Sequence, residues 1–192
     1  MNGPPLAERI ERVLFSAEEI DRRVGELAAE IVDDYSAGGT GKDVEGRPLR
    51  LVCVLRGALI FSADLARRLT IPIEYDLMSV SSYGNGTAPG AVRLVSDLAM
   101  PIEGRDVLIV EDIIDTGYTI DYLKRSLAAR RPASLRVCTL IDKVSRRVIP
   151  TDIDYSGLPL AEDAFIVGYG MDYAELYRNL PFIGVLKSEF AE

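Results

Sequence analysis

Residues 107–119 read VLIVEDIIDTGYT, and this stretch decides the expected fold. A short apolar run over 106–110 is typical of a strand that is buried on both faces. The adjacent carboxylates Glu111 and Asp112 end this strand, and Asp115 follows three residues later. A Thr-Gly turn then leads into a helical pattern over about 118–130, which Pro132 ends. We therefore predict a strand–turn–helix unit that gathers acids at the carboxyl end of its strand.

The turn after this strand has the chemistry of a sugar-phosphate site. A helix N-terminus offers free amides and a positive dipole end to a phosphate, and Gly117 lets the backbone approach closely. Successive strand residues point to opposite faces, so the two adjacent acids are expected to address different partners. Three nearby acids repel one another unless sugar hydroxyls or a cation engage them, which suggests Mg²⁺. An acidic turn that merely caps a helix is the plainer alternative, but the thirteen-residue pattern as a whole favours a functional site.

Strands and helices alternate along most of the chain. Ser16 and Glu19 form a capping box, which predicts a helix that ends near residue 35. A second helix is predicted over 58–69. Strands are predicted over the ranges 12–15, 51–55, 73–80, 91–96 and 134–141, with 91–96 as the returning arm of a hairpin. This alternation predicts an α/β fold, a mostly parallel twisted sheet flanked by helices, whose ligands bind beyond the carboxyl ends of the strands.

The chain changes character after about residue 144, where the helical pattern stops. Short strands are predicted over 165–168 and 182–186, and together with the N-terminal segment they are expected to cap the ligand end of the sheet. We predict a single domain over 1–192, with a core of about 36–150 and a small hood formed by about 1–15 and 151–192.

The composition argues against several classes of protein. The net charge of −8 argues against a nucleic-acid partner, because an acidic surface repels a phosphate backbone. The chain has no histidine, so zinc sites and histidine-based triads are not expected. Cys53 and Cys138 lie in apolar runs and are predicted to be buried free thiols. The N-terminus lacks the features of a signal peptide and no apolar run has the length of a membrane span, so we expect a cytoplasmic protein without a membrane partner.

Residues 107–119 resemble the signature that binds phosphoribosyl pyrophosphate (PRPP) in type I phosphoribosyltransferases. Most of the chain, over about residues 10–187, resembles the bacterial hypoxanthine-guanine phosphoribosyltransferase family. The further matching motifs occur in the expected order. They are the pyrophosphate loop at 54–65, a mobile loop at 81–84, a purine-contacting lysine segment at 140–143, a purine-stacking hood segment at 165–173 and an arginine motif at 177–181.

The resemblance implies a division of labour around PRPP. It assigns Glu111 and Asp112 to the ribose hydroxyls, and it makes Asp115 the acid or base at N7 of the purine. The 5-phosphate is given to the turn residues Thr116, Gly117, Tyr118 and Thr119, and the pyrophosphate to Arg56, Gly57 and Arg178.

The resemblance also implies how the base and the metal are held. Lys143 donates to O6 of the purine, Phe165 stacks on the base, and the backbone of Ile166 contacts the base edge. Mg²⁺ is assigned to Asp172, with Glu111 and Asp112 as further metal-binding acids, and Asp172 is also placed at the purine. Ser82 and Tyr83 are assigned to a lid loop over 82–90.

Several of these residues have plainer explanations when they are taken alone. Arg56 and Gly57 suit an ordinary strand end and turn, Lys143 suits a solvated lysine paired to Asp142, and Phe165 suits a core aromatic. The stretch 82–90 suits an ordinary loop. Two positions depart from the family pattern: bacterial relatives often carry Lys at position 56, and a small aliphatic or basic residue is common at position 118. The resemblance further implies a non-proline cis bond at the Arg56-Gly57 peptide.

The implied reaction transfers the phosphoribosyl group of PRPP to N9 of hypoxanthine or guanine, giving IMP or GMP and pyrophosphate. The implied enzyme depends on Mg²⁺, acts in purine salvage and is a homodimer or homotetramer. Three rivals stay open: an enzyme that prefers xanthine, a PRPP-binding RNA attenuator with the same fold, and a PRPP sensor without catalysis. The acidic balance and the 165–172 segment argue against the RNA-binding rival.

Overall fold

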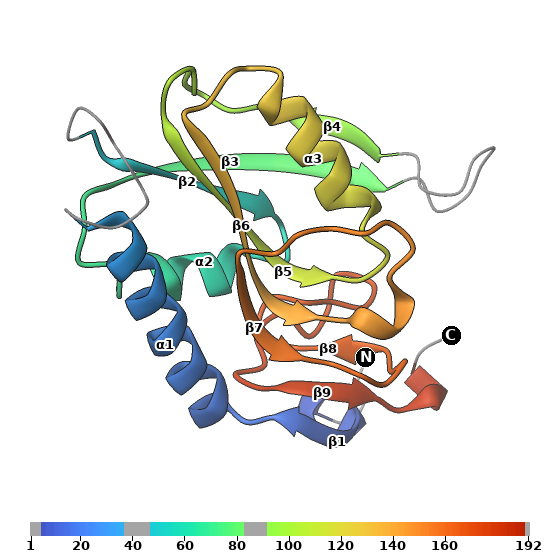
Figure 1. Ribbon diagram of the computed structural model, residues 1–192. Coiled ribbons are helices and arrows are strands. Elements are labelled where there is room, and N and C mark those ends of the chain that lie inside the picture. The colour runs from blue at the N-terminus through green and yellow to red at the C-terminus, as the bar shows by residue number, and fades with distance from the viewer. Residues whose placement is uncertain (1–4, 37–46, 83–91, 191–192) are drawn as a thin grey trace.

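The computed structural model describes residues 5–36, 47–82 and 92–190, so Tyr83 and the rest of the predicted lid loop up to Gly90 lie outside the described residues. The elements alternate between strands and helices as predicted (Figure 1). In chain order they are η1 Leu6–Arg9, β1 Ile10–Phe15, α1 Ala17–Tyr35, β2 Leu49–Leu55, α2 Leu59–Ala66, β3 Ile73–Ser82, β4 Val92–Ser96, β5 Asp106–Ile114, α3 Tyr118–Ala128, β6 Ser134–Asp142, η2 Val144–Arg146, β7 Tyr155–Pro159, β8 Ile166–Val167, β9 Ile183–Leu186 and η3 Ser188–Phe190.

The main sheet has six strands in the order β4-β3-β2-β5-β6-β7. All neighbours are parallel except β3 and β4, which pair antiparallel as the predicted hairpin. The chain runs outward from β2 to β3 and β4, and then crosses back to β5, β6 and β7 on the other side. The strand order therefore reverses between β2 and β5, and a crevice is expected at the carboxyl ends of these two strands.

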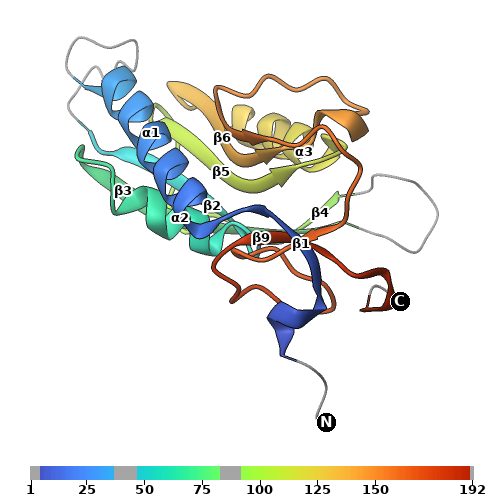
Figure 2. The same ribbon diagram turned by 90° about the horizontal axis from the view of Figure 1, so that it is seen from below.

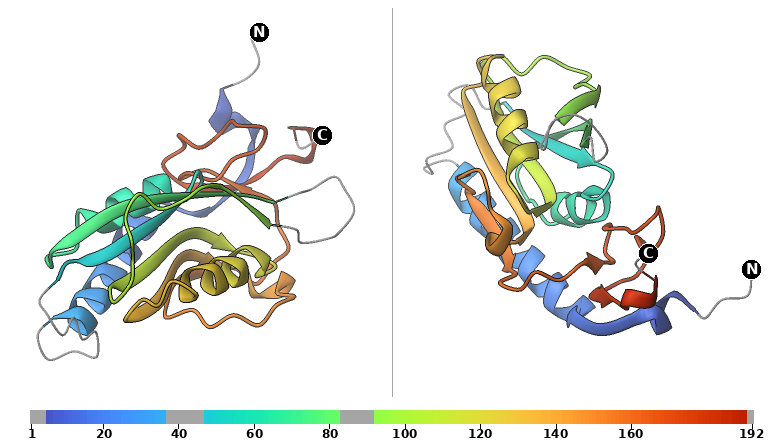
Figure 3. Two further views of the ribbon diagram at one scale, coloured as in Figure 1. Left: turned by 90° about the horizontal axis from the view of Figure 1, so that it is seen from above. Right: turned by 90° about the vertical axis from the view of Figure 1, so that its right-hand side faces the viewer.

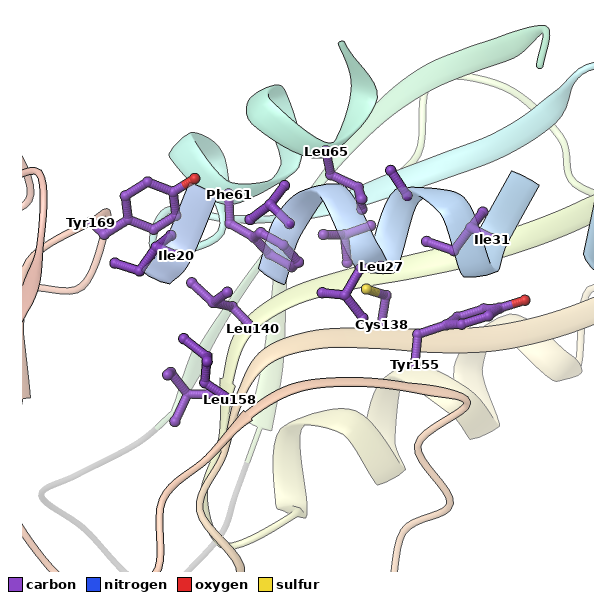
Figure 4. Close-up of a cluster of buried hydrophobic side chains, with 14 of the residues drawn as sticks. Ile20, Leu27, Ile31, Phe61, Leu65, Cys138, Leu140, Tyr155, Leu158 and Tyr169 are labelled. Atoms are coloured by element: carbon purple, nitrogen blue, oxygen red, sulfur yellow. The ribbon is translucent and has the colours of Figure 1, made fainter. Parts of the chain in front are cut away.

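Helices cover both faces of the main sheet, as a parallel sheet requires. The helices α1 and α2 share one buried apolar cluster with the sheet, whereas α3 belongs to a second cluster on the opposite face (Figure 3). Figure 4 shows the first cluster, in which Ile20, Leu27 and Ile31 of α1 lie with Phe61 and Leu65 of α2 over the sheet. Each fully buried side chain of this size contributes about 1.5–3 kcal/mol. This double layer makes the carboxyl ends of β2 and β5 a rigid platform.

A second sheet of three strands, in the order β1-β9-β8, forms the hood. The strand β1 pairs antiparallel with β9, so the first and the last strand of the chain lie side by side (Figure 2). Gly168, just after β8, has a φ of +103°, and a Cβ atom there would lie 2.1 Å from the carbonyl oxygen of Phe182. The close turn after β8 brings the following residues back toward the main sheet.

Several predicted elements are confirmed with small changes in their bounds. The capping box of Ser16 and Glu19 is formed at the start of α1, and α1 ends at Tyr35. The helix predicted over 58–69 is shorter than expected, and Ser82, predicted as the first residue of a loop, is the last residue of β3. One strand was missed: β7, which pairs with β6 at the edge of the main sheet. Its sequence Tyr-Ser-Gly-Leu-Pro lacks an apolar run or a regular alternation, so only its pairing with β6 defines it.

Both cysteines are free and buried, which confirms that prediction. In the described ranges, no helix has both the length and the apolar character that crossing a bilayer needs.

Candidate active site

A cleft of about 340 Å³ opens at the point where the strand order reverses. It lies between the ends of β2 and β5 on one side and the hood on the other. Its walls join segments that are far apart in the sequence. They are Arg56, Gly57, Asp112, Ile113, Asp115, Lys143, Arg146, Ala164, Phe165, Ile166, Met171, Asp172 and Arg178. Nine of the sequence-predicted residues therefore line one cleft: Arg56, Gly57, Asp112, Asp115, Lys143, Phe165, Ile166, Asp172 and Arg178.

The strand β5 delivers its acids to two different hollows. We expected the strand to end at Glu111 and Asp112, but β5 continues to Ile114, because its pairing with β6 extends to that residue. Both acids therefore obey the alternation of a strand. Asp112 lines the main cleft, whereas Glu111 lines a smaller hollow of about 220 Å³. Asp115, just beyond the strand, lines both.

Gly57 is needed because the carboxylate of Asp112 lies against its backbone. A Cβ atom at Gly57 would lie 1.7 Å from Oδ2 of Asp112, which no side chain can occupy. The non-proline cis bond is also present, but it joins Leu55 to Arg56. The expectation of a cis bond at Arg56-Gly57 was therefore wrong by one peptide, because the bond lies directly where β2 ends.

The two strand acids are held in surroundings that disfavour their charge. Burial raises the pKa of Asp112 to about 6, although the amide of Ile113 donates to Oδ1 at 2.9 Å and lowers it in part. Burial, with a smaller contribution from the charge of Asp112, raises the pKa of Glu111 well above its usual range. Oε2 of Glu111 is buried without a partner in the described part of the chain. A buried acceptor of this kind is suited to a ligand that donates hydroxyl hydrogen bonds.

We expect Asp112→Asn to stabilise the ligand-free protein at neutral pH. The native pKa of about 6 exceeds the unfolded value of about 3.9, so between these values the native state binds more protons and its free energy of unfolding falls as pH rises. The free energy of unfolding of the variant should exceed that of the unaltered chain by about 1–3 kcal/mol at pH 7.5, and the difference should vanish below about pH 4. Urea unfolding at a series of pH values measures it. Asp33→Asn, on the exposed last turn of α1, is the control. If the free energy of unfolding of Asp112→Asn varied with pH in the same way as that of the unaltered chain, the prediction would be wrong.

The predicted phosphate turn lies between β5 and α3. Gly117 has a φ of +91°, a conformation that favours glycine. A Cβ atom there would also lie 2.6 Å from the carbonyl oxygen of Ile149, so glycine is required for both reasons. The amides of Val148 and Ile149 both donate to the carbonyl oxygen of Thr116 at 3.0 Å, which fixes the turn from outside. The smaller hollow is lined by the turn residues Thr116, Gly117 and Thr119, but its lining does not include Tyr118.

Lys143 is buried, with 4 % of its surface exposed, and is not the solvated partner of Asp142. Its Nζ is 2.8 Å from Oδ1 of Asp163 and donates to the carbonyl oxygen of Ala164 at 3.0 Å. Asp142 instead pairs with Arg147 at 2.5 Å. An ammonium group has three donors, so two are fixed by the protein and the third remains available to the cleft.

Phe165 is not a core residue, since it is 52 % exposed at the cleft. Its ring makes an edge-to-face contact with the ring of Tyr173, with centroids 5.5 Å apart. The ring therefore presents a supported, accessible flat surface to whatever binds beside it.

The two arginines predicted for pyrophosphate meet at one carboxylate. Arg56 pairs with Oε1 of Glu175 at 2.6 Å, and Arg178 pairs with Oε2 of the same residue at 3.3 Å. Arg178 also pairs with Oδ1 of Asp172 at 2.8 Å and donates to the carbonyl oxygen of Gly170 at 2.8 Å. The end of β2 and the hood thus bring two guanidinium groups together, which is a suitable arrangement for a multiply charged anion.

The predicted metal-binding acids do not form a ready-made cage. Across the described ranges, no three acidic or other metal-binding side chains converge on one point. The reason is the alternation of β5, which sends Glu111 and Asp112 to different hollows. Of the three predicted metal-binding acids, only Asp112 and Asp172 therefore line the main cleft, where Asp115 also lies. Two carboxylates in one cleft fit Mg²⁺, because this ion is commonly bound by one or two carboxylates together with substrate phosphates and water.

Two neighbouring arginines lie at the site although no sequence motif singled them out. Arg147 donates through Nε to the carbonyl oxygen of Asp115 at 3.0 Å and through Nη2 to that of Ile114 at 3.1 Å. Arg146 lines the main cleft. The available signal was a pair of basic residues shortly after Lys143, beyond the carboxyl end of a predicted strand.

The fold and the cleft together define a phosphoribosyltransferase, with an acid-rich turn, a phosphate cradle and a slot for a flat base at one sheet edge. The family model of the phosphoribosyl transferase domain matches residues 14–174. The hypoxanthine-guanine phosphoribosyltransferase of Mycobacterium avium is 49% identical over 180 residues, covering 92% of this chain and 86% of the relative. That of Bacillus subtilis is 48% identical over 179 residues, covering 93% and 94%.

Solved structures agree with these sequences. A hypoxanthine phosphoribosyltransferase from Staphylococcus aureus superposes with a TM-score of 0.88 at 39% identity, over 100% of both chains. The hypoxanthine phosphoribosyltransferase of Trypanosoma cruzi in complex with the product IMP has a TM-score of 0.86 at 43% identity, covering 97% of this chain and 100% of the other. The chain belongs to the phosphoribosyltransferase family and, within it, to the hypoxanthine-guanine phosphoribosyltransferases.

Proposed function

We propose that this enzyme transfers the phosphoribosyl group of PRPP to N9 of hypoxanthine or guanine and releases pyrophosphate. One observation carries the proposal: Asp115, the buried Lys143 and the accessible ring of Phe165 line one cleft, and Asp115 also lines the hollow of the phosphate turn. A sugar phosphate and a flat oxopurine need these groups at one place. The family membership of the chain supports the same reaction.

The ribose-phosphate part of the substrate is assigned to β5 and its turn. The turn of Thr116, Gly117 and Thr119 holds the 5-phosphate at the N-terminus of α3, and Tyr118 contributes its backbone. Glu111 and Asp112 accept hydrogen bonds from the ribose hydroxyls. Both acids are half-buried, and desolvation raises their pKa values. Hydrogen bonds donated by the sugar would stabilise the charged carboxylates that desolvation disfavours.

The base is held between the hood and the end of β6. Phe165 stacks on the purine, the backbone of Ile166 contacts its edge, and Lys143 donates its remaining hydrogen bond to O6. Adenine carries a donor where 6-oxopurines carry O6, so it cannot accept the hydrogen bond from the ammonium group and is disfavoured. Asp115 holds or releases the proton at N7 while the bond at N9 forms.

The leaving pyrophosphate is assigned to Arg56, Arg178 and the backbone of Gly57. Asp172, with Asp112 in the same cleft, is proposed to hold Mg²⁺ directly or through water. When bound, Mg²⁺ neutralises charge on the pyrophosphate. The lid role of Ser82 and Tyr83 and the homodimeric or homotetrameric state remain proposals from the family resemblance.

The proposed specificity is tested by measuring PRPP-dependent turnover with hypoxanthine, guanine, xanthine and adenine in the presence of Mg²⁺. We expect hypoxanthine or guanine to be converted, and adenine to be slower by at least about a hundredfold, since its amino group opposes Lys143. Adding excess chelator should abolish turnover, and adding Mg²⁺ back should restore it. Conversion of xanthine alone would support the xanthine-preferring rival, and no turnover of any base would support a PRPP sensor. Filter binding with RNA tests the attenuator rival.

A further inference from the structure

Arg146 and Arg147 are neighbours with different tasks. Arg147 has a structural role: it donates to the carbonyl oxygens of Ile114 and Asp115 at the end of β5 and pairs with Asp142. Arg146 makes only two ion pairs in the described part of the chain, at 3.5 Å to Oδ2 of Asp115 and 3.7 Å to Oδ1 of Asp163. Both distances exceed the 2.7–2.9 Å of a charge-assisted hydrogen bond. Arg146 is therefore held in place by charge, with its donors still available.

The backbone presents Arg146 from a fixed turn. It closes η2, the turn directly after Lys143, where the amide of Arg147 donates to the carbonyl oxygen of Val144 at 3.1 Å. The amide of Lys143 donates to the carbonyl oxygen of Ile114 at 3.1 Å, and the segment after η2 is bound to Thr116. The side chain of Arg146 is half-exposed and lines the same cleft as Lys143 and Phe165.

Three charged residues of the cleft wall and the neighbouring Asp163 form an ordered row. Asp115 is followed by Arg146, then Asp163, then Lys143, which pairs with Asp163 at 2.8 Å. The proposed function places Asp115 at N7 of the purine and Lys143 at O6. Arg146 lies between these two ends of the row, so it faces the edge of the base that carries N7 and O6.

We propose, on the basis of the function proposed above, that Arg146 is a second donor to the N7/O6 edge of the base and a specificity-determining residue. Lys143 and Arg146 both present hydrogen-bond donors, so a 6-oxo group can accept from both, whereas a 6-amino group places a donor against two donors. A guanidinium group suits this task, since it donates in fixed directions and stays charged. Asp163 and Asp115 balance the two positive charges while the cleft is empty.

The experiment compares Arg146→Leu, Arg146→Lys and the unaltered chain with hypoxanthine and with 6-mercaptopurine, whose sulfur is a weaker acceptor than oxygen. We expect Arg146→Leu to lower kcat/KM for hypoxanthine by roughly ten- to a hundredfold, the effect of losing a charge-assisted hydrogen bond. The loss for 6-mercaptopurine should be several times smaller, and KM for PRPP should stay within about twofold. Arg146→Lys should recover most of the activity. Arg125→Leu removes an exposed arginine from α3 and serves as the matched control.

The possible outcomes separate this inference from the function on which it rests. Equal losses for both bases, or a parallel rise in KM for PRPP, would assign Arg146 a structural role and overturn the inference alone. Unchanged kinetics in Arg146→Leu would do the same. If Arg146→Leu failed to fold, Arg146→Gln would replace it. The ratio of kcat/KM for hypoxanthine to that for 6-mercaptopurine should then be higher in Arg146→Lys than in Arg146→Gln, and equal ratios would overturn the inference. An unaltered chain that turned over neither hypoxanthine nor guanine would overturn the proposed function and this inference with it.

Discussion

Replacing Asp115 with asparagine is expected to lower kcat by about 10²- to 10⁴-fold, the usual contribution of a positioned general acid or base. Asparagine has the same shape as aspartate but cannot take up or release the N7 proton. Oδ1 of Asp115 is buried without a partner in the described residues, and Oδ2 is 3.5 Å from Arg146. No strong contact is broken, so the fold should survive the change. Steady-state turnover with saturating hypoxanthine and PRPP measures the effect.

The design of this test separates chemistry from binding. KM for PRPP should change much less than kcat, because the phosphate turn keeps its backbone. The thermal midpoint of Asp115→Asn should remain within a few degrees of the unaltered chain. Asp33→Asn makes the same change of charge on an exposed turn of α1 and should leave turnover intact. A turnover rate in Asp115→Asn equal to that of the unaltered chain would remove Asp115 from the proposed mechanism.

Replacing Lys143 with methionine is expected to lower kcat/KM for hypoxanthine by roughly ten- to a hundredfold. Methionine fills the same buried space but has no donor, so the substrate loses a charge-assisted hydrogen bond worth about 1.5–3 kcal/mol. The Asp163 carboxylate that loses Lys143 is exposed to water and keeps its ion pair with Arg146, so the fold should tolerate the change. Initial rates at several base concentrations, with PRPP saturating, measure this effect.

Selectivity is the sharper readout for Lys143. Without the ammonium group, no donor of residue 143 faces the 6-amino group of adenine. The ratio of kcat/KM for hypoxanthine to that for adenine should therefore fall. Lys124→Met changes a partly exposed lysine of α3 that lies outside the cleft lining and provides the control. If Lys143→Met lowered the rates with every base and raised KM for PRPP equally, Lys143 would be a structural residue and the assignment to O6 would be wrong.

The local elements were readable from the sequence because their causes are local. The capping box at Ser16 fixes the start of α1 through hydrogen bonds within four residues. The periodicity of Ile20, Val24, Leu27 and Ile31 predicted the buried face of that helix, and all four are buried. The failures have non-local causes: β7 has no apolar pattern and is defined by its pairing with β6, and β5 extends past its apolar run because β6 continues beside it.

The site could be predicted only where residues are adjacent in the chain. Residues 107–119 carry the acids, the glycine turn and the helix start together, so their joint role was visible. The pairing of Arg56 and Arg178 with one carboxylate, and the position of Arg146 beside Asp115, depend on separate segments meeting in space. The family resemblance supplied roles for most of these residues, but it gave no geometry.

The sequence by itself determined the alternation of strands and helices, the phosphate turn and the chemical classes of side chain that the site offers. It did so because periodicity, capping and turn chemistry act over a few residues. Only the tertiary structure decided which hollow each acid of β5 faces, and that the hood brings Phe165 and Arg178 against the ends of β2 and β5. The physical reason is that strand order and close backbone packing, such as Gly170 against the carbonyl oxygen of Gly57, are set by contacts between residues distant in the chain.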